Sequence, residues 1–322
     1  MGGSTDKNRR EPAPPVEERN VVKAIPEIHV VSVFGAGPAG GNPAPIILDA
    51  DALPDSEMQA ITRQYGHEAG FVLQAQEGSG CDLALRFWVP NHEVAMCGHA
   101  TVGAVWLLDA LGRLPTSSLS ISTASGIVRA TVTHEGSADR IVRVSQPVGE
   151  VQEIANPEFL AEVGSVLGLQ ATDLASFPVQ NARTSRVKTL IPMADEGVLD
   201  RLAPDFARME ALCDRVNSTG MYPYAVVNPT LQVFAARQFP RSSGYPEDAA
   251  TGIAAAALAF GLLANGLVEA SDRDIVIRQG WAMGRPSEIR VNFEMKDGAV
   301  SACWIGGKVT LSDLAPDHAH DR

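Results

Sequence analysis

Residues 27–48 read EIHVVSVFGAGPAGGNPAPIIL, and this stretch separates two kinds of fold. The apolar run at 28–34 predicts a buried strand. The glycines that follow have the G-x-G-x-x-G spacing of a dinucleotide-binding turn, in which the backbone approaches a pyrophosphate closely. Such a turn requires a helix directly after the glycines, because the pyrophosphate is bound at the N-terminus of that helix.

The residues after the glycines do not favour a helix. Pro43 fits only the first turn of a helix, and Pro45 and Pro54 interrupt any longer one. Residues 46–48 form a short apolar run between turn residues, which predicts a second strand. We therefore expect a strand, a loop and a strand. A glycine fingerprint alone is weak support for a dinucleotide site.

Composition excludes several classes of function. The chain has 322 residues, of which 45% are hydrophobic, and this is enough for two domains with a full core each. A net charge of -12 argues against nucleic acid and against anionic membrane surfaces as partners. The longest apolar run, at 253–264, is too short to span a bilayer. The four cysteines have no paired spacing, so we expect reduced thiols and a cytoplasmic protein.

The chain divides into two domains between two tails. Residues 1–26 are charged and Pro-rich, which predicts a disordered tail, and residues 314–322 predict a frayed one. We place an N-terminal α/β domain at 27–147 and a C-terminal α/β domain at 148–313, whose last strand could cross back to the first domain.

The two predicted domains repeat one pattern. Residues 86–112 and 237–266 each begin with a strand that ends in Arg and aromatic residues. Each continues through Pro and a polar loop into an apolar helix that ends at Gly, and we align Ala100-Thr101 with Ala250-Thr251. Both helices are apolar almost all round, so each must be enclosed on every side. This predicts a mixed sheet curled around a central helix, twice; a layered α/β domain with one buried helix is the alternative.

Five motifs resemble a known family. VFGAGPAGGNP, HEAGFVL, RFWVPNHEVAMCGHATVGA, YPEDAATGIAAAAL and RQGWAMGRPSEI occur in this order. Together they resemble the phenazine biosynthesis PhzF-like family, within the diaminopimelate epimerase-like fold. The resemblance implies two pseudo-symmetric α/β (α+β) domains with the active site in the cleft between them. It also implies an isomerase without a cofactor that moves protons on small carboxylic acids, and it assigns the glycine loop to the family's GNP loop.

Glu68, in HEAGFVL, is the catalytic acid/base that the resemblance implies. The apolar residues at 71–73 would partly desolvate its carboxylate, which raises the pKa and makes it a better base near neutral pH. A solvated glutamate at a strand start is the alternative. His67 stands where the family commonly has serine, which leaves the hydrogen-bond partner of Glu68 open.

The resemblance also assigns roles at the two helix starts. It implies that His99 relays a proton while the Gly98 and His99 amides hold a substrate carboxylate, since a helix N-terminus attracts anions. Asp248 would orient the substrate or His99, and a helix N-cap is a compatible role for it.

The remaining substrate contacts come from the same helix starts and from the glycine loop. Gly252 and Ile253 would offer a second pair of amides, although TGIA stands where TGSA is usual, so a serine hydroxyl is absent. Asn42 is expected to line the cleft, with turn formation as the alternative.

Cys97 raises two further possibilities. In related epimerases a cysteine at this position is one of two thiol bases, but the second position falls near Ala249, so we expect Cys97 to be a small buried residue. His92, Glu93, Cys97 and His99 match no standard zinc spacing, and we expect no metal.

These observations favour a cofactor-independent isomerase that shifts a proton and a double bond on a small unsaturated carboxylic acid, in antibiotic-type specialised metabolism. The alternatives are a non-catalytic small-molecule-binding protein with the same cleft and, less favoured, a cysteine-based racemase. The expected partner is the small acid, with no nucleic acid and no membrane; a homodimer is compatible with this scheme.

Overall fold

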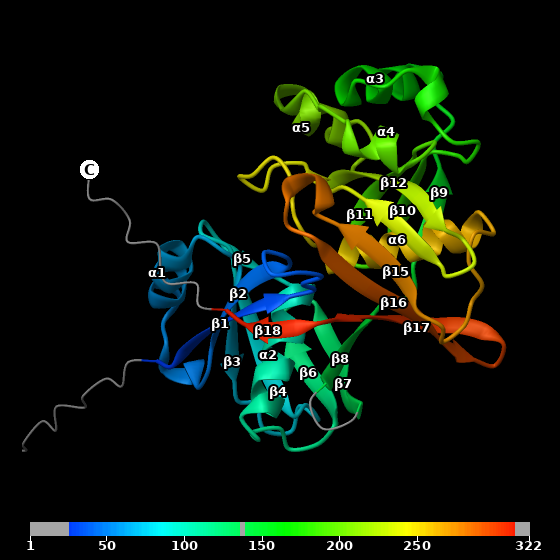
Figure 1. The fold of residues 1–322 in the computed structure, drawn as a ribbon. Helices are drawn as coiled ribbons and strands as arrows, with labels where there is room; N and C mark the ends of the chain where they lie inside the picture. Colours follow the sequence, from blue (N-terminus) through cyan, green and yellow to red (C-terminus); the bar gives the residue numbers. More distant parts are fainter. Residues whose placement is uncertain (1–25, 136–138, 313–322) are drawn as a thin grey trace, which may run out of the picture.

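The computed structural model describes residues 26–135 and 139–312. Apart from Pro26, the two predicted tails lie outside the described residues. Each half of the chain forms a sheet curled around one helix, and the two halves lie side by side (Figure 1). Among the described helices, none combines the length and the hydropathy that crossing a membrane needs.

The first half encloses helix α2 (Gly98–Ala110), with α1 (Asp55–Tyr65) on its outside. Neighbouring strands in this half are mostly antiparallel, but β2 and β3 are parallel, as are β4 and β6. Its strands are β1 (Ile28–Val33), β2 (Asn42–Ile47), β3 (Ala69–Leu73), β4 (Leu83–Trp88), β5 (Glu93–Val94), β6 (Ser118–Thr123), β7 (Gly126–Glu135) and β8 (Asp139–Gln146).

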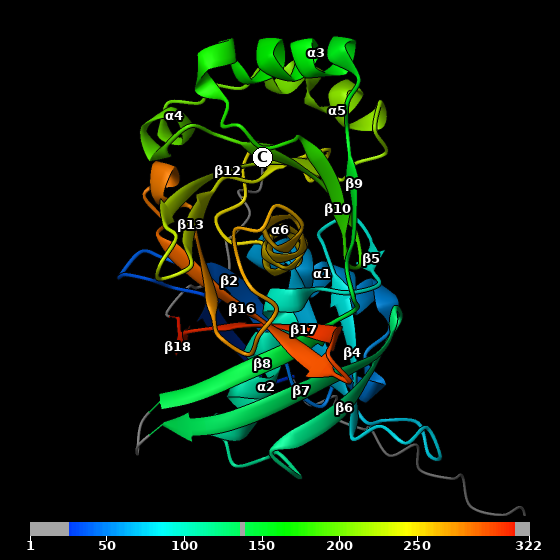
Figure 2. The ribbon, with the colours of Figure 1, turned by 90° about the vertical axis from the view of Figure 1, so that its right-hand side faces the viewer.

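The second half encloses helix α6 (Gly252–Ala264), which Figure 2 shows end-on with strands around it. Helices α3 (Pro157–Leu167), α4 (Glu196–Asp200) and α5 (Phe206–Asp214) cover the far side of this sheet. Parallel pairs again mix with antiparallel ones. Its strands are β9 (Glu150–Glu153), β10 (Gln180–Arg183), β11 (Val187–Pro192), β12 (Gly220–Asn228), β13 (Val233–Ala236), β14 (Phe239–Pro240), β15 (Ile275–Gln279), β16 (Ser287–Lys296) and β17 (Ala299–Gly307).

The end of the chain joins the two halves. Strand β17 pairs with β16 of the second half and also with β8 of the first half. Strand β18 (Val309–Leu311) then pairs antiparallel with β1. The described strands consequently form one continuous hydrogen-bonded network.

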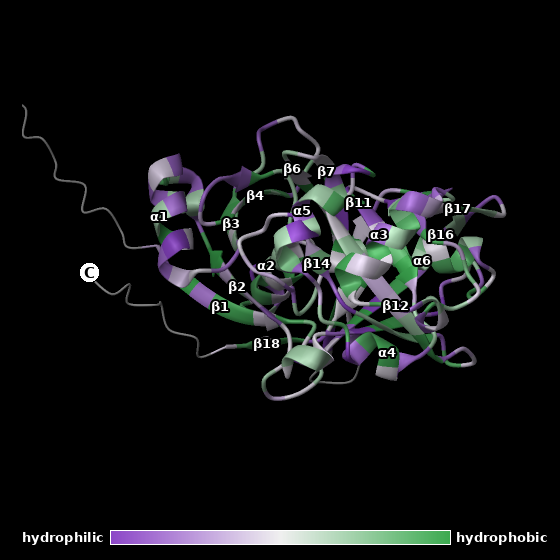
Figure 3. Cartoon of the chain, turned by 90° about the horizontal axis from the view of Figure 1, so that it is seen from above, coloured by the Kyte–Doolittle hydropathy of each residue, from purple (hydrophilic) through white to green (hydrophobic). Residues whose placement is uncertain are grey.

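Burial of the two central helices follows from their composition. Residues 98–105 of α2 and 254–262 of α6 are all buried. Neither helix has a polar face to turn toward water, so enclosure by strands is what makes it stable. Figure 3 shows hydrophobic colour on α2 and α6, and hydrophilic colour on the outer helix α1.

The predicted alignment of the two halves was wrong by about one helical turn. Both helices begin at a glycine, Gly98 in α2 and Gly252 in α6. Ala100-Thr101 lies within the first turn of α2, whereas Ala250-Thr251 precedes α6. Cys97 therefore corresponds to Thr251 and not to a position near Ala249, and His99 corresponds to Ile253.

The glycine loop connects two strands, as expected, and the structure shows that these strands pair antiparallel. Val33 of β1 pairs with Asn42 of β2, so the loop closes a hairpin. Two of its positions require glycine. A Cβ on Gly40 would lie 1.9 Å from the carbonyl oxygen of Pro286, and Gly41 has φ +90°, a backbone conformation that other residues rarely adopt. Strand β2 begins at Asn42, earlier than predicted, although it contains Pro43 and Pro45. These prolines are tolerated because β2 pairs with β3 only from Ile46 onward.

Candidate active site

A small cavity lies where the N-termini of α2 and α6 approach each other. Its volume is about 60 Å³, and both halves contribute to its wall. Six of the seven predicted site residues line it: Glu68, Gly98 and His99 from the first half, and Asp248, Gly252 and Ile253 from the second. The fold therefore brings together residues that are far apart in the sequence.

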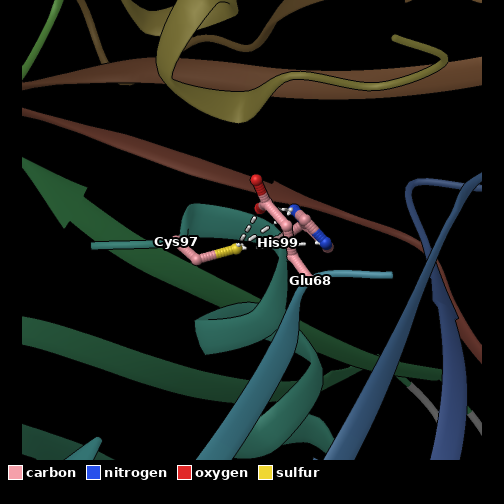
Figure 4. A group of neighbouring side chains, drawn as sticks. All are labelled: Glu68, Cys97 and His99. Atoms are coloured by element: carbon pink, nitrogen blue, oxygen red, sulfur yellow. Dashed lines mark hydrogen bonds and ion pairs between the residues drawn. The ribbon is translucent and has the colours of Figure 1, made fainter. Parts of the chain in front are cut away.

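Glu68 reaches the cavity because of two local features. Helix α1 ends at Gly66, whose φ of 68° reverses the chain direction. Two residues later, Glu68 directly precedes β3, which is paired on both sides by β2 and β4. The Glu68 side chain is 28% exposed and points toward Cys97 and His99 (Figure 4).

Glu68, Cys97 and His99 form one hydrogen-bonded cluster. The Cys97 thiol donates to Glu68 Oε2 over 2.9 Å, and its Sγ lies 3.3 Å from His99 Nδ1. The same His99 nitrogen is 3.7 Å from Glu68 Oε2. The sequence left the hydrogen-bond partner of Glu68 open, and the structure assigns this role to Cys97.

The cluster holds Cys97 as a neutral thiol. Burial raises the pKa of Cys97 well above its ordinary value, and the nearby negative charge of Glu68 raises it further. Glu68, Cys97 and His99 also place one potential metal-ligating atom each within 4.8 Å of one another. Cysteine binds a metal as the thiolate, whereas here the Cys97 thiol donates its proton to Glu68 in a hydrogen bond, an arrangement that suits a proton-donating thiol.

Asp248 lies across the cavity, ahead of the start of α6. Its Oδ1 accepts from Asn42 Nδ2 at 3.0 Å, and its Oδ2 accepts from Thr251 Oγ1 at 2.5 Å. Burial raises the pKa of Asp248, and the charge of Glu68 adds to this, while the Thr251 hydrogen bond opposes it. The N-cap position of α6 is occupied by Thr251, so capping is not the role of Asp248.

Asn42 does not line the cavity. It donates from Nδ2 to Asp248 and also to the carbonyl of Ala250, at 3.0 Å in each case. A residue of the first half thus fixes the loop of the second half that carries Asp248.

Gln279 also holds the loop that carries Asp248, and the sequence analysis did not single out this residue. It is fully buried. Its Nε2 donates to the Asp248 carbonyl at 2.7 Å and to Thr251 Oγ1 at 3.1 Å. Its Oε1 accepts from the Tyr222 hydroxyl at 2.8 Å.

The helix starts offer backbone amides on both sides of Ile305. A Cβ on Gly98 would lie 2.9 Å from Ile305 Cδ1, and a Cβ on Gly252 would lie 2.8 Å from the same atom. The side chains of the two N-cap residues, Cys97 and Thr251, form no capping hydrogen bond. The first amides of both helices are therefore suited to bind an anion.

Two cationic side chains, Arg186 and Lys188, also line the cavity. The sequence reasoning missed both. Lys188 lies on β11 and is only 5% exposed. Burial and the positive charge of Arg186 lower the pKa of Lys188 to about 8. The negative charges of Asp248 and Glu68 oppose this shift. A lysine inside the apolar run VKTLIP was the available signal.

The glycine loop lines a different and larger groove, of about 1050 Å³. His67 and Arg285 line this groove as well, whereas Glu68 faces the small cavity. The guanidinium of Arg285 donates to the Gly41 carbonyl at 3.1 Å, which ties the loop to the second half.

Comparison with known proteins identifies the family. A family model described as phenazine biosynthesis-like protein matches residues 31–313. An uncharacterized isomerase of Deinococcus radiodurans is 32% identical over 86% of this chain and 90% of its own length. The trans-2,3-dihydro-3-hydroxyanthranilate isomerase of Pseudomonas aeruginosa is 28% identical over 86% of this chain and 94% of its own length.

Solved structures show the same fold. The crystal structure of a Bacillus anthracis phenazine biosynthesis protein of the PhzF family matches with a TM-score of 0.78 at 24% identity, over 88% of this chain and 96% of that chain. The predicted fold class is thereby confirmed, with a curled mixed sheet around α2 and another around α6. The chain belongs to the phenazine biosynthesis-like (PhzC-PhzF) family, with the diaminopimelate epimerase-like fold, and it is an isomerase.

Proposed function

We propose that this isomerase shifts a proton, and with it a double bond, on a small unsaturated carboxylic acid without a cofactor. The observation that carries the proposal is the position of Glu68. Its carboxylate lies at the cavity beside His99, and the cavity also opens onto the unpaired amides of two helix starts. A base, a second proton carrier and an anion-binding element therefore face one small space.

The proposed reaction conserves all atoms. The helix-start amides bind the substrate carboxylate, which directs an acidic C–H bond toward Glu68. Glu68 takes the proton, and the electron pair of the C–H bond delocalises over the unsaturated system. Glu68, or His99 beside it, returns a proton at another carbon, and the double bond moves. The neutral Cys97 thiol steadies the ionised form of Glu68 through its hydrogen bond.

Asp248 and Ile253 shape the opposite wall. With a raised pKa and two hydrogen-bond donors, Asp248 is a fixed polar partner for the substrate or for His99. Ile253 occupies the position of His99 in the second half, so the wall there is apolar and suits an alkyl part of the substrate. The named activity of the Pseudomonas aeruginosa relative supports a substrate from specialised metabolism.

A two-thiol racemase is not favoured. The position of α6 that corresponds to Cys97 is Thr251. Cys81, Cys213 and Cys303 do not line the cavity. Within the described residues, Cys97 therefore has no second thiol to act on the other face of a substrate carbon.

Replacement of Glu68 by Gln tests the proposal. Glutamine keeps the size and the hydrogen bonding of the side chain but cannot accept the proton. Glu68→Gln should lower turnover by roughly 10²–10⁴-fold, the contribution typical of a positioned general base. The measurement is deuterium incorporation from heavy water into trans-2,3-dihydro-3-hydroxyanthranilate and a panel of unsaturated acids.

The matched control is Glu77→Gln, which changes an exposed glutamate outside the cavity and should keep the wild-type rate. Exchange by Glu68→Gln at the wild-type rate would show that Glu68 is not the base.

A further inference from the structure

Arg186 and Lys188 bring two positive charges to the cavity without a fixed partner. Within the described part of the chain, neither side chain forms a hydrogen bond or an ion pair, yet both line the same cavity as Glu68 and Asp248. Lys188 is almost fully buried, at 5% exposure. A buried ammonium group that no anion contacts is costly, because it has lost its hydrogen bonds to water and gained none in return.

Another buried cation of the described residues, Arg237, is fully paired. The Arg237 side chain makes a two-pronged contact with Glu247, at 2.9 and 2.7 Å. It also donates to the carbonyls of Leu199, Asp200 and Leu202. The contrast indicates that the partner of Arg186 and Lys188 is supplied from outside the chain.

We propose that Arg186 and Lys188 bind a second acidic group of the substrate, so that the substrate is a small dicarboxylic acid. The inference rests on the proposed function, in which the helix-start amides take the first carboxylate. A guanidinium offers a planar fork that matches a carboxylate, and an adjacent ammonium adds a mobile donor. The apolar wall at Ile253 then faces the carbon chain between the two acidic groups.

The contacts available to the two cations favour two carboxylates over one. Amides and helix dipoles are sufficient to hold a single carboxylate. A monoacid bound there would leave the cation pair without a contacting anion, because Glu68 and Asp248 form no ion pair with Arg186 or Lys188. A second carboxylate supplies that anion.

Binding of matched acids tests this inference. Succinate, glutarate and adipate are titrated calorimetrically into the full-length protein alongside butyrate, valerate and hexanoate, which replace one carboxylate by a methyl group. We expect at least one diacid to bind about tenfold or more tightly than its monoacid partner. Lys188→Met and Arg186→Gln should each abolish that preference, because each change should weaken diacid binding far more than monoacid binding. Lys296→Met, at an exposed lysine of β16 outside the cavity, should keep it.

The outcomes separate this inference from the proposed function. Equal binding of diacids and monoacids by the wild type, or an unchanged preference in both cavity variants, would overturn the dicarboxylate assignment. Glu68-dependent deuterium exchange would still stand in that case. Conversely, the diacid preference should persist in Glu68→Gln, since that variant changes the base and keeps both cations.

Discussion

At the scale of single residues, the thiol of Cys97 acts as a hydrogen-bond donor to the carboxylate of Glu68. A serine hydroxyl can make the same donation, whereas alanine cannot. We expect Cys97→Ser to keep turnover within about tenfold of wild type and Cys97→Ala to lose more, because a charge-assisted hydrogen bond is worth roughly 1.5–3 kcal/mol. Steady-state kinetics of the two variants provide the measurement.

A different ranking of these variants would reveal thiol chemistry. If Cys97→Ser falls more than about 100-fold while remaining folded, roughly 2.7 kcal/mol of barrier, the thiol is reacting itself and not merely donating.

Lys188 should make the stability of the free enzyme depend on pH. Its pKa falls from the ordinary 10.5 to about 8 on folding, so the unfolded chain binds more protons between these values. The contribution of Lys188 to the free energy of unfolding should therefore rise with pH across this window, and comparing wild type with Lys188→Met isolates that contribution. Lys188→Met should be more stable than wild type near neutral pH, by up to about 3 kcal/mol, and the gain should shrink as the pH approaches 10.5.

Urea titrations at neutral and alkaline pH measure the Lys188 effect. Lys296→Met again serves as the control, with no pH-dependent gain expected from an exposed lysine. A constant difference between Lys188→Met and wild type at both pH values would contradict the assignment.

At the scale of elements, the side chain of Ile305 packs against the first glycine of both central helices. Gly98→Ala would push a Cβ to 2.9 Å from Ile305 Cδ1, and Gly252 leaves Ile305 no room on its other side. We expect Gly98→Ala to lose about 1–3 kcal/mol of stability through overpacking. Ile305→Val removes the crowded methyl group, so the double variant should lose less than the sum of the two single changes.

Denaturant unfolding of the single and double variants completes this cycle. Gly164→Ala in α3 is the matched control, because its new Cβ would meet the nearest atom at an ordinary 3.6 Å. It should be neutral or stabilising. Strict additivity of Gly98→Ala and Ile305→Val would mean that the new Cβ at position 98 does not press on Ile305.

The central helices were predictable because their composition allows one environment only. Residues 254–262 contain no polar side chain, so any fold must enclose them. The register between the two halves was not predictable in the same way. An Ala-Thr pair occurs near both helix starts. The pair lies inside the first turn of α2 but precedes α6, and nothing in the sequence indicates this difference of about one turn.

At the scale of the whole molecule, Asn42 connects the two halves at the site. Asn42→Ala removes two hydrogen bonds and leaves Asp248 with one donor fewer in a half-buried position. We expect a loss of about 1–3 kcal/mol in the free energy of unfolding, together with slower turnover, because the loop that carries Asp248 is less firmly held.

Thermal unfolding and kinetics of Asn42→Ala measure both effects. Gln59→Ala removes one exposed amide hydrogen bond, to the Asn91 carbonyl, and should change stability by no more than about 0.5 kcal/mol. Wild-type turnover in Asn42→Ala would show that Asp248 does not depend on this link.

The parts of the site that sequence reasoning missed are those built by long-range contacts. Asn42 and Asp248 are 206 residues apart, and only the packing of one half on the other brings them together. Arg186 and Lys188 belong to none of the motifs that carry the family resemblance. They reach the cavity because β11 is curled around α6, and that curvature cannot be read from a strand's own residues.

The pairing of the last two strands has a consequence for the order in which the protein can be completed during synthesis. Strand β18 lies against β1, and β17 lies against β8, so both borders of the first sheet are covered by the end of the chain. Until residues 299–311 leave the ribosome, β1 and β8 are edge strands with unpaired backbone groups. Exposed edge strands of this kind promote aggregation. The half that is translated first is therefore finished last.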